Sequence, residues 1–302
     1  MILSDTSILK DRPVAISIGT FDGVHLGHKE LLDVLNRDAK KKGLASVVIS
    51  FNNIPRGFIT GEKIPMVLAT KDKLELIDAL GIDYTLGIDF NEQIQGLSKR
   101  EFFEYLQLDV RHVVMGYDHK FGHERRPFQL QDISWDVVGP VVIDDQVISS
   151  TLLRRYLTEG NMEAMYQATG HHHFYSGVVV HGHKRGKKLG FPTMNLSLCD
   201  NLYTIKRGVY VTQTLVQGQW LHSVTNVGFN PSFEDKSFTV ETHILDYEGM
   251  LYSEEIKVRF LHYIREERYF GQLQDLIQQI EEDVVYARDY VLKSPMKGYS
   301  HD

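Results

Sequence analysis

The pattern of apolar residues changes near residue 170, and this change restricts the folds open to the chain more than any other feature. Before it, strand-like runs such as Val14–Ile18 and Ala45–Phe51 alternate with segments of helical spacing such as Leu26–Leu35. Strands that alternate with helices are typical of a parallel sheet covered by helices. The sequence therefore predicts an α/β N-terminal domain.

Beyond residue 170 the chain is rich in strand-like runs and poor in helical ones. Gly177–Val180, Val209–Leu215 and Thr239–Leu245 are strand candidates, and turn signals such as Gln217-Gly218 separate them. This pattern predicts an all-β antiparallel sheet or barrel. A C-terminal amphipathic helix follows, because its apolar residues share one face. They are Leu273, Leu276, Ile277, Ile280, Val284 and Ala287.

The boundary between the two parts is predicted near residue 170. Tyr156–Thr169 has the pattern of a single helix, and Gly170 is a usual C-terminal stop. We therefore expect domains at 1–170 and 171–302, and a chain of 302 residues is long enough for two.

Composition excludes several classes of function. A net charge of −7 argues against a nucleic-acid partner. The sequence contains no stretch of about 18 apolar residues, so no membrane-spanning helix is expected. Met1–Lys10 lacks the features of a secretion signal. Cys199 is the one cysteine, which excludes a disulfide within the chain. A cytoplasmic protein is expected.

The run Gly19–His28 (GTFDGVHLGH) lies between the first predicted strand and the first predicted helix. Glycines allow a tight turn and close approach of a ligand, and a helix N-terminus favours phosphate. His25 and His28 share a face of the helix and can both donate hydrogen bonds to a reacting phosphate. A glycine turn with two surface histidines is the other interpretation, but the position between strand and helix favours phosphate chemistry.

A second polar run, Ile148–Arg154, closes the same predicted domain. The hydroxyls of Ser149, Ser150 and Thr151 and the guanidinium of Arg154 can hold ATP phosphates at the start of a helix. The other interpretation of the hydroxyl residues is a helix N-cap.

The run Gly182–Asn195 (GHKRGKKLGFPTMN) joins a basic glycine-rich loop to Pro-Thr-x-Asn. Its glycines let backbone amides approach phosphates, although the run is not a Walker motif. Thr193 and Asn195 offer oxygen ligands of the kind that Mg²⁺ prefers. The other interpretation of the basic residues is a solvated loop.

These runs together resemble the prokaryotic bifunctional riboflavin kinase/FAD synthetase family. Gly19–His28 is similar to the family's adenylyltransferase signature, and Ser149–Arg154 is similar to its Ser-Ser-Thr-x-x-Arg motif. Gly190–Asn195 differs from the family's kinase signature, Gly-Phe-Pro-Thr-Ala-Asn, only at Met194. The resemblance covers nearly the full chain. Further matches are Gly208–Tyr210, Asn226–Gly228, Glu241–Asp246 and Ile264–Glu267.

The resemblance implies a Rossmann-like nucleotidyltransferase domain followed by a barrel-like riboflavin kinase domain. It implies phosphorylation of riboflavin to FMN and adenylation of FMN to FAD, with ATP as co-substrate and Mg²⁺ as cofactor. Catalytic roles would fall to Glu241, His25 and His28, flavin binding to Asn226 and Arg265, and metal binding to Thr193 and Asn195. Nucleotide and phosphate binding would fall to Gly19, Phe21, Asp22, Gly23, Gly27, Asp118, Ser149, Ser150, Thr151, Arg154, Gly182, Lys184, Arg185, Gly186, Lys187, Gly190 and Pro192.

Two departures from the family pattern leave alternatives open. Ile54 stands where the family has the histidine of Pro-His-Pro, and His119 replaces an aromatic residue. One alternative is a riboflavin kinase with a weakened adenylyltransferase domain. Another is a flavin-binding regulator without turnover. The sequence does not predict the oligomeric state.

Overall fold

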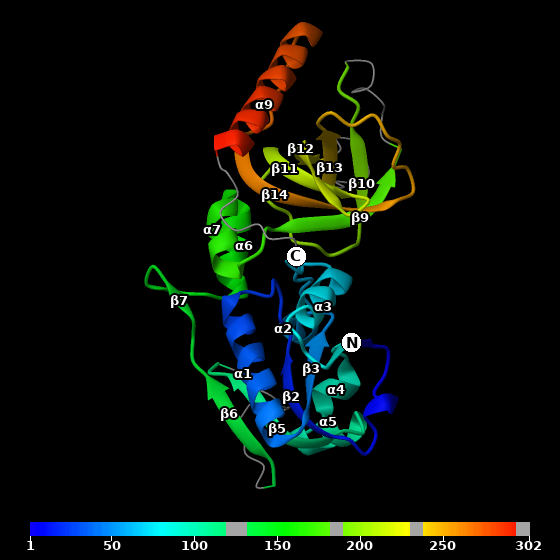
Figure 1. Ribbon diagram of the computed structural model, residues 1–302, viewed down its shortest axis with the longest axis vertical. Helices are drawn as coiled ribbons and strands as arrows, with labels where there is room; N and C mark the ends of the chain where they lie inside the picture. The colour runs from blue at the N-terminus through cyan, green and yellow to red at the C-terminus, as the bar shows by residue number, and fades with distance from the viewer. Residues whose placement is uncertain (119–131, 182–189, 230–237, 294–302) are drawn as a thin grey trace. The chain divides into compact units, whose positions relative to one another are not determined.

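The computed structural model describes residues 1–118, 132–181, 190–229 and 238–293, and the chain divides into two compact units (Figure 1). The first unit comprises Met1–Leu153, Ala168–Gly170 and Asn201–Tyr203. The second comprises Arg154–Gln167, His171–Asp200 and the chain from Thr204 onward. The first division, between Leu153 and Arg154, falls inside a helix (Ser150–Glu159). The domain boundary at residue 170 therefore stays a prediction.

The first unit is built on a parallel sheet, as predicted. Its strand order is β1-β4-β3-β2-β5-β6, and every neighbouring pair is parallel. These strands are β1 (Ile2–Leu3), β2 (Pro13–Gly19), β3 (Ala45–Phe51), β4 (Tyr84–Ile88), β5 (Asp109–Gly116) and β6 (Ser134–Val138). A short hairpin follows, with β7 (Val142–Ile143) and β8 (Gln146–Val147).

Helices connect the strands from β1 to β5 and cover the sheet. They are the 3₁₀ helix η1 (Ser7–Leu9), α1 (Leu26–Lys42), α2 (Pro55–Thr60), α3 (Thr70–Asp78), α4 (Glu92–Gly96) and α5 (Lys99–Tyr105). Alternate residues of β2 and β3 pack with α4 and α5 in one apolar cluster. Helix α1 contacts β2, β3 and β5 and buries Leu31, Leu32 and Leu35 outside that cluster.

Helix α1 has clear signals at both ends. Its N-cap is His25, and its C-cap Gly43 has the left-handed conformation that a glycine adopts at little cost. Lys40, Lys41 and Lys42 in the last turn complement the negative end of the helix dipole. The sequence therefore places the start of this helix, with its two histidines, at the end of β2.

The predicted single helix over residues 156–169 is wrong, because two helices occupy this region. Helix α6 (Ser150–Glu159) ends at Gly160, whose φ of +74° does not continue a helix. Helix α7 (Met162–Thr169) begins at Asn161, whose side-chain oxygen accepts a hydrogen bond from the Ala164 amide at 3.0 Å. A glycine followed by a capping asparagine therefore breaks the helical pattern.

The second unit contains a closed antiparallel barrel, which confirms the predicted all-β domain. The strand order is β10-β13-β12-β11-β14-β9. The strands are β9 (Phe174–Val180), β10 (Met194–Leu198), β11 (Gly208–Val216), β12 (Gln219–Phe229), β13 (Phe238–Ile244) and β14 (Glu255–Arg265). The predicted C-terminal helix is present as α9 (Leu273–Lys293) and lies against the barrel (Figure 1).

The barrel uses its two faces differently. Inside, fully buried hydroxyls form a chain of hydrogen bonds of 2.8–2.9 Å that includes Thr212, Ser223, Thr225 and Thr242. Outside, an apolar cluster that includes Val209 packs against α9. Because strand residues alternate between the faces, a residue next to a buried threonine projects outward.

Most of α6 and α7 belongs to the second unit, which leads to a prediction about fragments. Glu163 of α7 hydrogen-bonds His262 of β14, and the Lys206 amide donates to the Leu157 carbonyl at 2.8 Å. A fragment from Arg154 keeps these contacts, whereas one from His171 loses them. We expect both fragments to fold, with a Tm about 5 °C lower for the shorter one, the shift that about 1 kcal/mol produces in a small domain. Equal melting temperatures would show that α6 and α7 do not stabilise the barrel.

Candidate active sites

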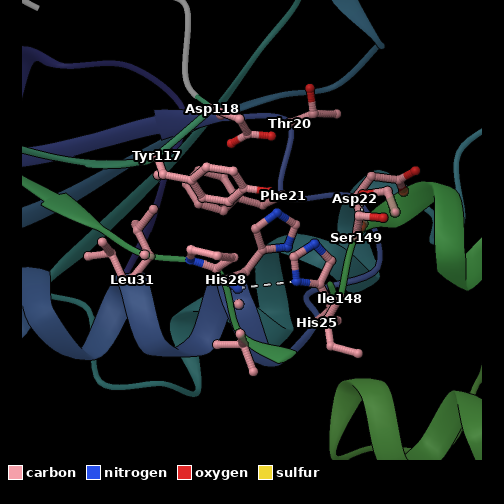
Figure 2. Close-up of a pocket in the computed structure, with 18 of the residues that line it drawn as sticks. Thr20, Phe21, Asp22, His25, His28, Leu31, Tyr117, Asp118, Ile148 and Ser149 are labelled. Carbon is pink, nitrogen blue, oxygen red and sulfur yellow. Dashed lines mark hydrogen bonds between the residues drawn. The ribbon is translucent and has the colours of Figure 1, made fainter. Parts of the chain in front are cut away.

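A pocket of about 370 Å³ opens at the carboxyl ends of the parallel strands (Figure 2). Strand β2 pairs with β3 on one side and β5 on the other, so the order in which successive strands are added to the sheet reverses at β2. Such a switch point is where open α/β sheets bind ligands. Ten residues predicted from the sequence line it: Gly19, Phe21, Asp22, His25, Gly27, His28, Asp118, Ser149, Ser150 and Thr151. Gly23 and Arg154, also predicted, are not among its lining residues.

The two histidines are held together at the start of α1. The Nδ1 atom of His25 accepts a hydrogen bond from the His28 amide at 3.3 Å, drawn as a dashed line in Figure 2. The two rings stack with centroids 3.6 Å apart, and the ring of Phe21 meets that of His28 edge-on at 5.2 Å. Because Nδ1 of His25 accepts, the neutral ring carries its proton on Nε2.

Both imidazoles are neutral near pH 7. Burial lowers the pKa of His25 to about 4. Burial also lowers the pKa of His28 well below its usual value, and the neighbouring His25 and Lys73 add to this effect. Nδ1 of His28 is buried and has no hydrogen-bond partner among the described residues. The pair therefore offers preorganised polar atoms rather than fixed positive charge.

Two glycines of the first motif have separate steric roles. Gly23 has a φ of +81°, and a Cβ there would lie 2.4 Å from Cδ1 of Leu153. A Cβ at Gly27 would lie 3.1 Å from Nδ1 of His25. The absence of a side chain at Gly23 thus lets the turn pack closely against Leu153, which does not line the pocket. The absence of a side chain at Gly27 leaves room for the His25 ring.

Several polar residues of the pocket also hold its backbone in place. The Asp22 carboxylate accepts from the Val67 amide at 2.8 Å, and the Ser150 hydroxyl donates to the Asp22 carbonyl at 2.9 Å. The Ser149 hydroxyl accepts from the Leu152 amide at 3.3 Å, which is the capping role that the sequence left as an alternative. These contacts join the loop after β2 to the start of α6.

Lys73 is a residue of this region that the sequence motifs do not reveal. It is fully buried on α3, and its ammonium donates to the carbonyls of Thr20 at 3.0 Å and Phe51 at 2.5 Å. Burial lowers its pKa to about 8, although the nearby Asp22 carboxylate opposes that shift. Lys73 thus ties the carboxyl ends of β2 and β3 together. Its burial could have been predicted from its position four residues before the buried Ile77, because residues at that spacing share a face of a helix.

Replacing Lys73 by methionine should weaken the first unit and its pocket. The change keeps the length of the side chain but removes the donor to the Phe51 carbonyl and leaves the Thr20 carbonyl with only the Ser50 hydroxyl, at 3.3 Å. A buried acceptor left without a partner costs about 1–3 kcal/mol. We expect a lower free energy of unfolding by denaturant and loss of chemistry in this pocket, with chemistry in the barrel retained. Lys71→Met, at an exposed position of the same helix, is the control. Equal stability of the two variants would contradict the role of Lys73.

A second pocket, of about 260 Å³, lies between the outer face of the barrel and α9. Strand register places Asn195, Glu241, Asn226, Val209 and Arg265 in one row across β10, β13, β12, β11 and β14. Residues directly opposite each other in antiparallel strands share a face. Of these five, Glu241, Asn226, Val209 and Arg265 line the pocket.

The predicted flavin-binding residues are linked to α9 and to the end of β14. Nε and Nη2 of Arg265 donate to the two oxygens of the Asp283 carboxylate, at 2.8 and 2.6 Å, and Asp283 is 4% exposed. The Asn226 amide donates to Glu267 at 3.2 Å. Arg265 therefore fixes α9 over the pocket through a bidentate ion pair. Glu267, Asp283 and the α9 residues Leu276 and Ile280 line this pocket as well, and the motifs did not assign them.

The predicted metal ligands lie at one end of this row. Thr193 lines the pocket, and Asn195 is paired with Glu241 in the ladder. Hydroxyl, amide and carboxylate oxygens together suit Mg²⁺.

Two of the predicted phosphate ligands of the barrel unit are described. The Pro192 carbonyl accepts from Nδ1 of His243 at 2.8 Å, and Gly190 has a φ of +86°. The predicted phosphate ligands Gly182, Lys184, Arg185, Gly186 and Lys187, and also His119, lie outside the described residues.

A pocket at the switch point of a parallel sheet on one unit and a pocket of mixed charge on a barrel in the other are the arrangement of a nucleotide-dependent transferase with two sites. Residues 7–152 match the FAD synthetase family, and residues 169–291 match the riboflavin kinase family. The chain belongs to the bifunctional riboflavin kinase/FMN adenylyltransferase family.

Individual relatives support this membership over most of the chain. The enzyme of that name from Bacillus subtilis is 32% identical over 289 residues, covering 91% of this chain and 92% of its own. The Escherichia coli K12 enzyme is 32% identical over 288 residues, with coverage of 91% and 92%. A crystal structure from Streptococcus pneumoniae described as a macrolide-efflux protein is 29% identical, with a TM-score of 0.84 and coverage of 95% and 98%. In the described part of the chain, no helix is long and apolar enough to cross a membrane.

Proposed function

We propose that this chain phosphorylates riboflavin to FMN in the barrel pocket and adenylates FMN to FAD in the pocket of the parallel sheet. The observation that carries the proposal is that predicted residues from distant parts of the chain converge in two separate pockets. Each pocket lies in the half of the chain that matches the corresponding family. Because both reactions consume ATP, the cytoplasm is the setting that we propose.

In the barrel pocket, Glu241 orients the riboflavin 5′-hydroxyl and accepts its proton as the oxygen attacks the γ-phosphorus of ATP, and ADP leaves with the electrons of the broken bond. A carboxylate with an ordinary pKa of about 4.3 is a weak base, so orientation of the hydroxyl is its larger contribution. Thr193 and Asn195 would hold Mg²⁺, which would supply neutralisation of phosphate charge. Arg265 and Asn226 position the flavin, with α9 closing the pocket through Asp283.

In the sheet pocket, an oxygen of the FMN phosphate attacks the α-phosphorus of ATP, and pyrophosphate leaves with the electrons of the broken bond. His25 and His28 donate hydrogen bonds to the phosphate oxygens where charge develops. The N-terminal end of α1 adds its dipole. A bound triphosphate favours the protonated imidazoles, so binding raises the low pKa values that burial imposes on the two histidines.

The departure at Ile54 affects the edge of this unit rather than the described pocket. Ile54 is the N-cap residue of α2 and is not among the residues that line the pocket. This placement supports the bifunctional enzyme over a kinase with a weakened adenylyltransferase domain. The relatives that share both domains support it as well.

One incubation separates the three candidate functions. Purified protein is mixed with riboflavin, ATP and Mg²⁺, and the flavins are resolved by chromatography. We expect FAD, with FMN as an intermediate. FMN alone would indicate the weakened domain, and unchanged riboflavin would indicate a binding protein without turnover.

A further inference from the structure

A cluster of potential metal ligands lies apart from both pockets. Asp38 of α1, His112 of β5 and Asp136 of β6 each direct a side-chain atom into a space where these atoms lie within 4.8 Å of one another. His112 is fully buried, while the Asp38 and Asp136 side chains are 19% and 57% exposed. The cluster thus joins three elements and remains open to solvent at Asp136.

The position of the proton on His112 follows from Ser134. The Ser134 hydroxyl donates to the Arg111 carbonyl at 3.1 Å, so its oxygen accepts at 2.8 Å from Nδ1 of His112. With the proton on Nδ1, the neutral ring directs the lone pair of Nε2 at two carboxylates. Those oxygens lie 3.4 Å away on Asp38 and 3.5 Å away on Asp136. Three acceptors thus face one another, an arrangement that a shared positive centre would stabilise.

The distances favour a metal ion over a proton as that centre, although the 3.4 Å contact with Asp38 is also within hydrogen-bonding distance. A protonated imidazole forms short hydrogen bonds to carboxylates, with N–O distances of about 2.7–2.9 Å. The observed 3.4 and 3.5 Å exceed that range. Ligand atoms about 2.0–2.1 Å from a tetrahedral Zn²⁺ lie about 3.3 Å from one another. The separations therefore match neighbouring positions of a metal coordination shell.

We propose that Asp38, His112 and Asp136 form a binding site for a divalent transition-metal ion, with Zn²⁺ as the best fit. One imidazole and two carboxylates suit Zn²⁺, whereas Mg²⁺ prefers oxygen ligands alone. Water completes the shell on the exposed side of Asp136. The Ser134 contact is the outer interaction that metal-bound histidines commonly have, since it fixes the ring and its tautomer.

The site gives α1 a second anchor. Asp38 follows His25 by thirteen residues on the same helix, a rise of about 20 Å. The metal site is therefore separate from the nucleotide pocket, and it clamps the far end of the helix whose first turn carries His28. Its expected role is to fix α1 against β5 and β6.

Zn²⁺ binding to the full chain tests the proposal. The protein is treated with chelator, dialysed, and titrated with Zn²⁺ by calorimetry, and its Tm is measured with and without the ion. We expect one saturable site per chain and a rise in Tm, since the ion binds the folded state. Ser134→Ala should weaken this binding by about 10-fold, within the range of about 10–100-fold for partners of a ligand, and Asp136→Asn should weaken it more because it removes a ligand carboxylate.

Asp33→Asn is the matched control, because Asp33 is an exposed carboxylate on the same helix. It should bind Zn²⁺ as the unmodified chain does, which separates loss of a ligand from loss of charge. The proposal is overturned if Asp136→Asn and Ser134→Ala keep the affinity of the control. It is equally overturned if the unmodified chain binds no Zn²⁺ and NMR shows His112 doubly protonated, because a proton would then be the shared centre.

Discussion

Glu241→Gln should abolish FMN formation while the enzyme still converts added FMN to FAD. Glutamine keeps the shape of the side chain but has one acceptor oxygen and no charge, so it neither orients the hydroxyl nor accepts its proton as a carboxylate does. Loss of a positioned general base typically lowers the rate by about 10²–10⁴-fold. The ladder positions of Glu241 beside Asn195 and Asn226 do not depend on its charge, so the barrel should remain folded.

The matched control is Glu248→Gln, the same substitution at an exposed position after β13. It should leave both rates unchanged. Phosphorylation measured by chromatography, with thermal unfolding alongside, distinguishes lost chemistry from lost structure. Near-normal FMN formation by Glu241→Gln would remove Glu241 from the mechanism.

His28→Ala should stop FAD formation while FMN accumulates from riboflavin. The ring of His28 is held between His25 and Phe21, so it is preorganised for the phosphate oxygens. Removal of one such donor at a developing charge costs about 10²–10³-fold in rate. His28→Asn, which retains an N–H donor on a shorter side chain, should recover part of that loss.

Kinase activity of the same chain is the internal control for this variant. FMN formation by His28→Ala should equal that of the unmodified chain, because Glu241 and Arg265 lie in the second unit. FAD formation at the normal rate would show that His28 does not act on the phosphates.

Much of the fold could be predicted because its signals are local. The alternation of strands and helices up to β5 and the turn signals of the barrel reflect periodicity within short segments. The row of Asn195, Glu241 and Asn226 could not be predicted, because strand register depends on pairing between distant segments. The motifs identified its members separately, and the ladder shows that they are neighbours.

Short motifs also fail to distinguish ligand contacts from structural ones. Asp22 and Ser149 belong to motifs that predict nucleotide binding, yet both side chains hydrogen-bond to nearby backbone amides. Lys73 has the opposite property, since no motif contains it and its contacts are with the ends of two strands. The cluster around His112 brings together three elements, and no spacing rule joins them.

The central claim is that one chain carries two independent active sites, and mixing the two inactive variants tests it most directly. With riboflavin, ATP and Mg²⁺, neither Glu241→Gln nor His28→Ala alone should yield FAD. Mixed together they should, because His28→Ala supplies FMN that Glu241→Gln adenylates. A mixture that yields no FAD, although each variant remains folded and FMN accumulates, would contradict the assignment of the two reactions to separate sites.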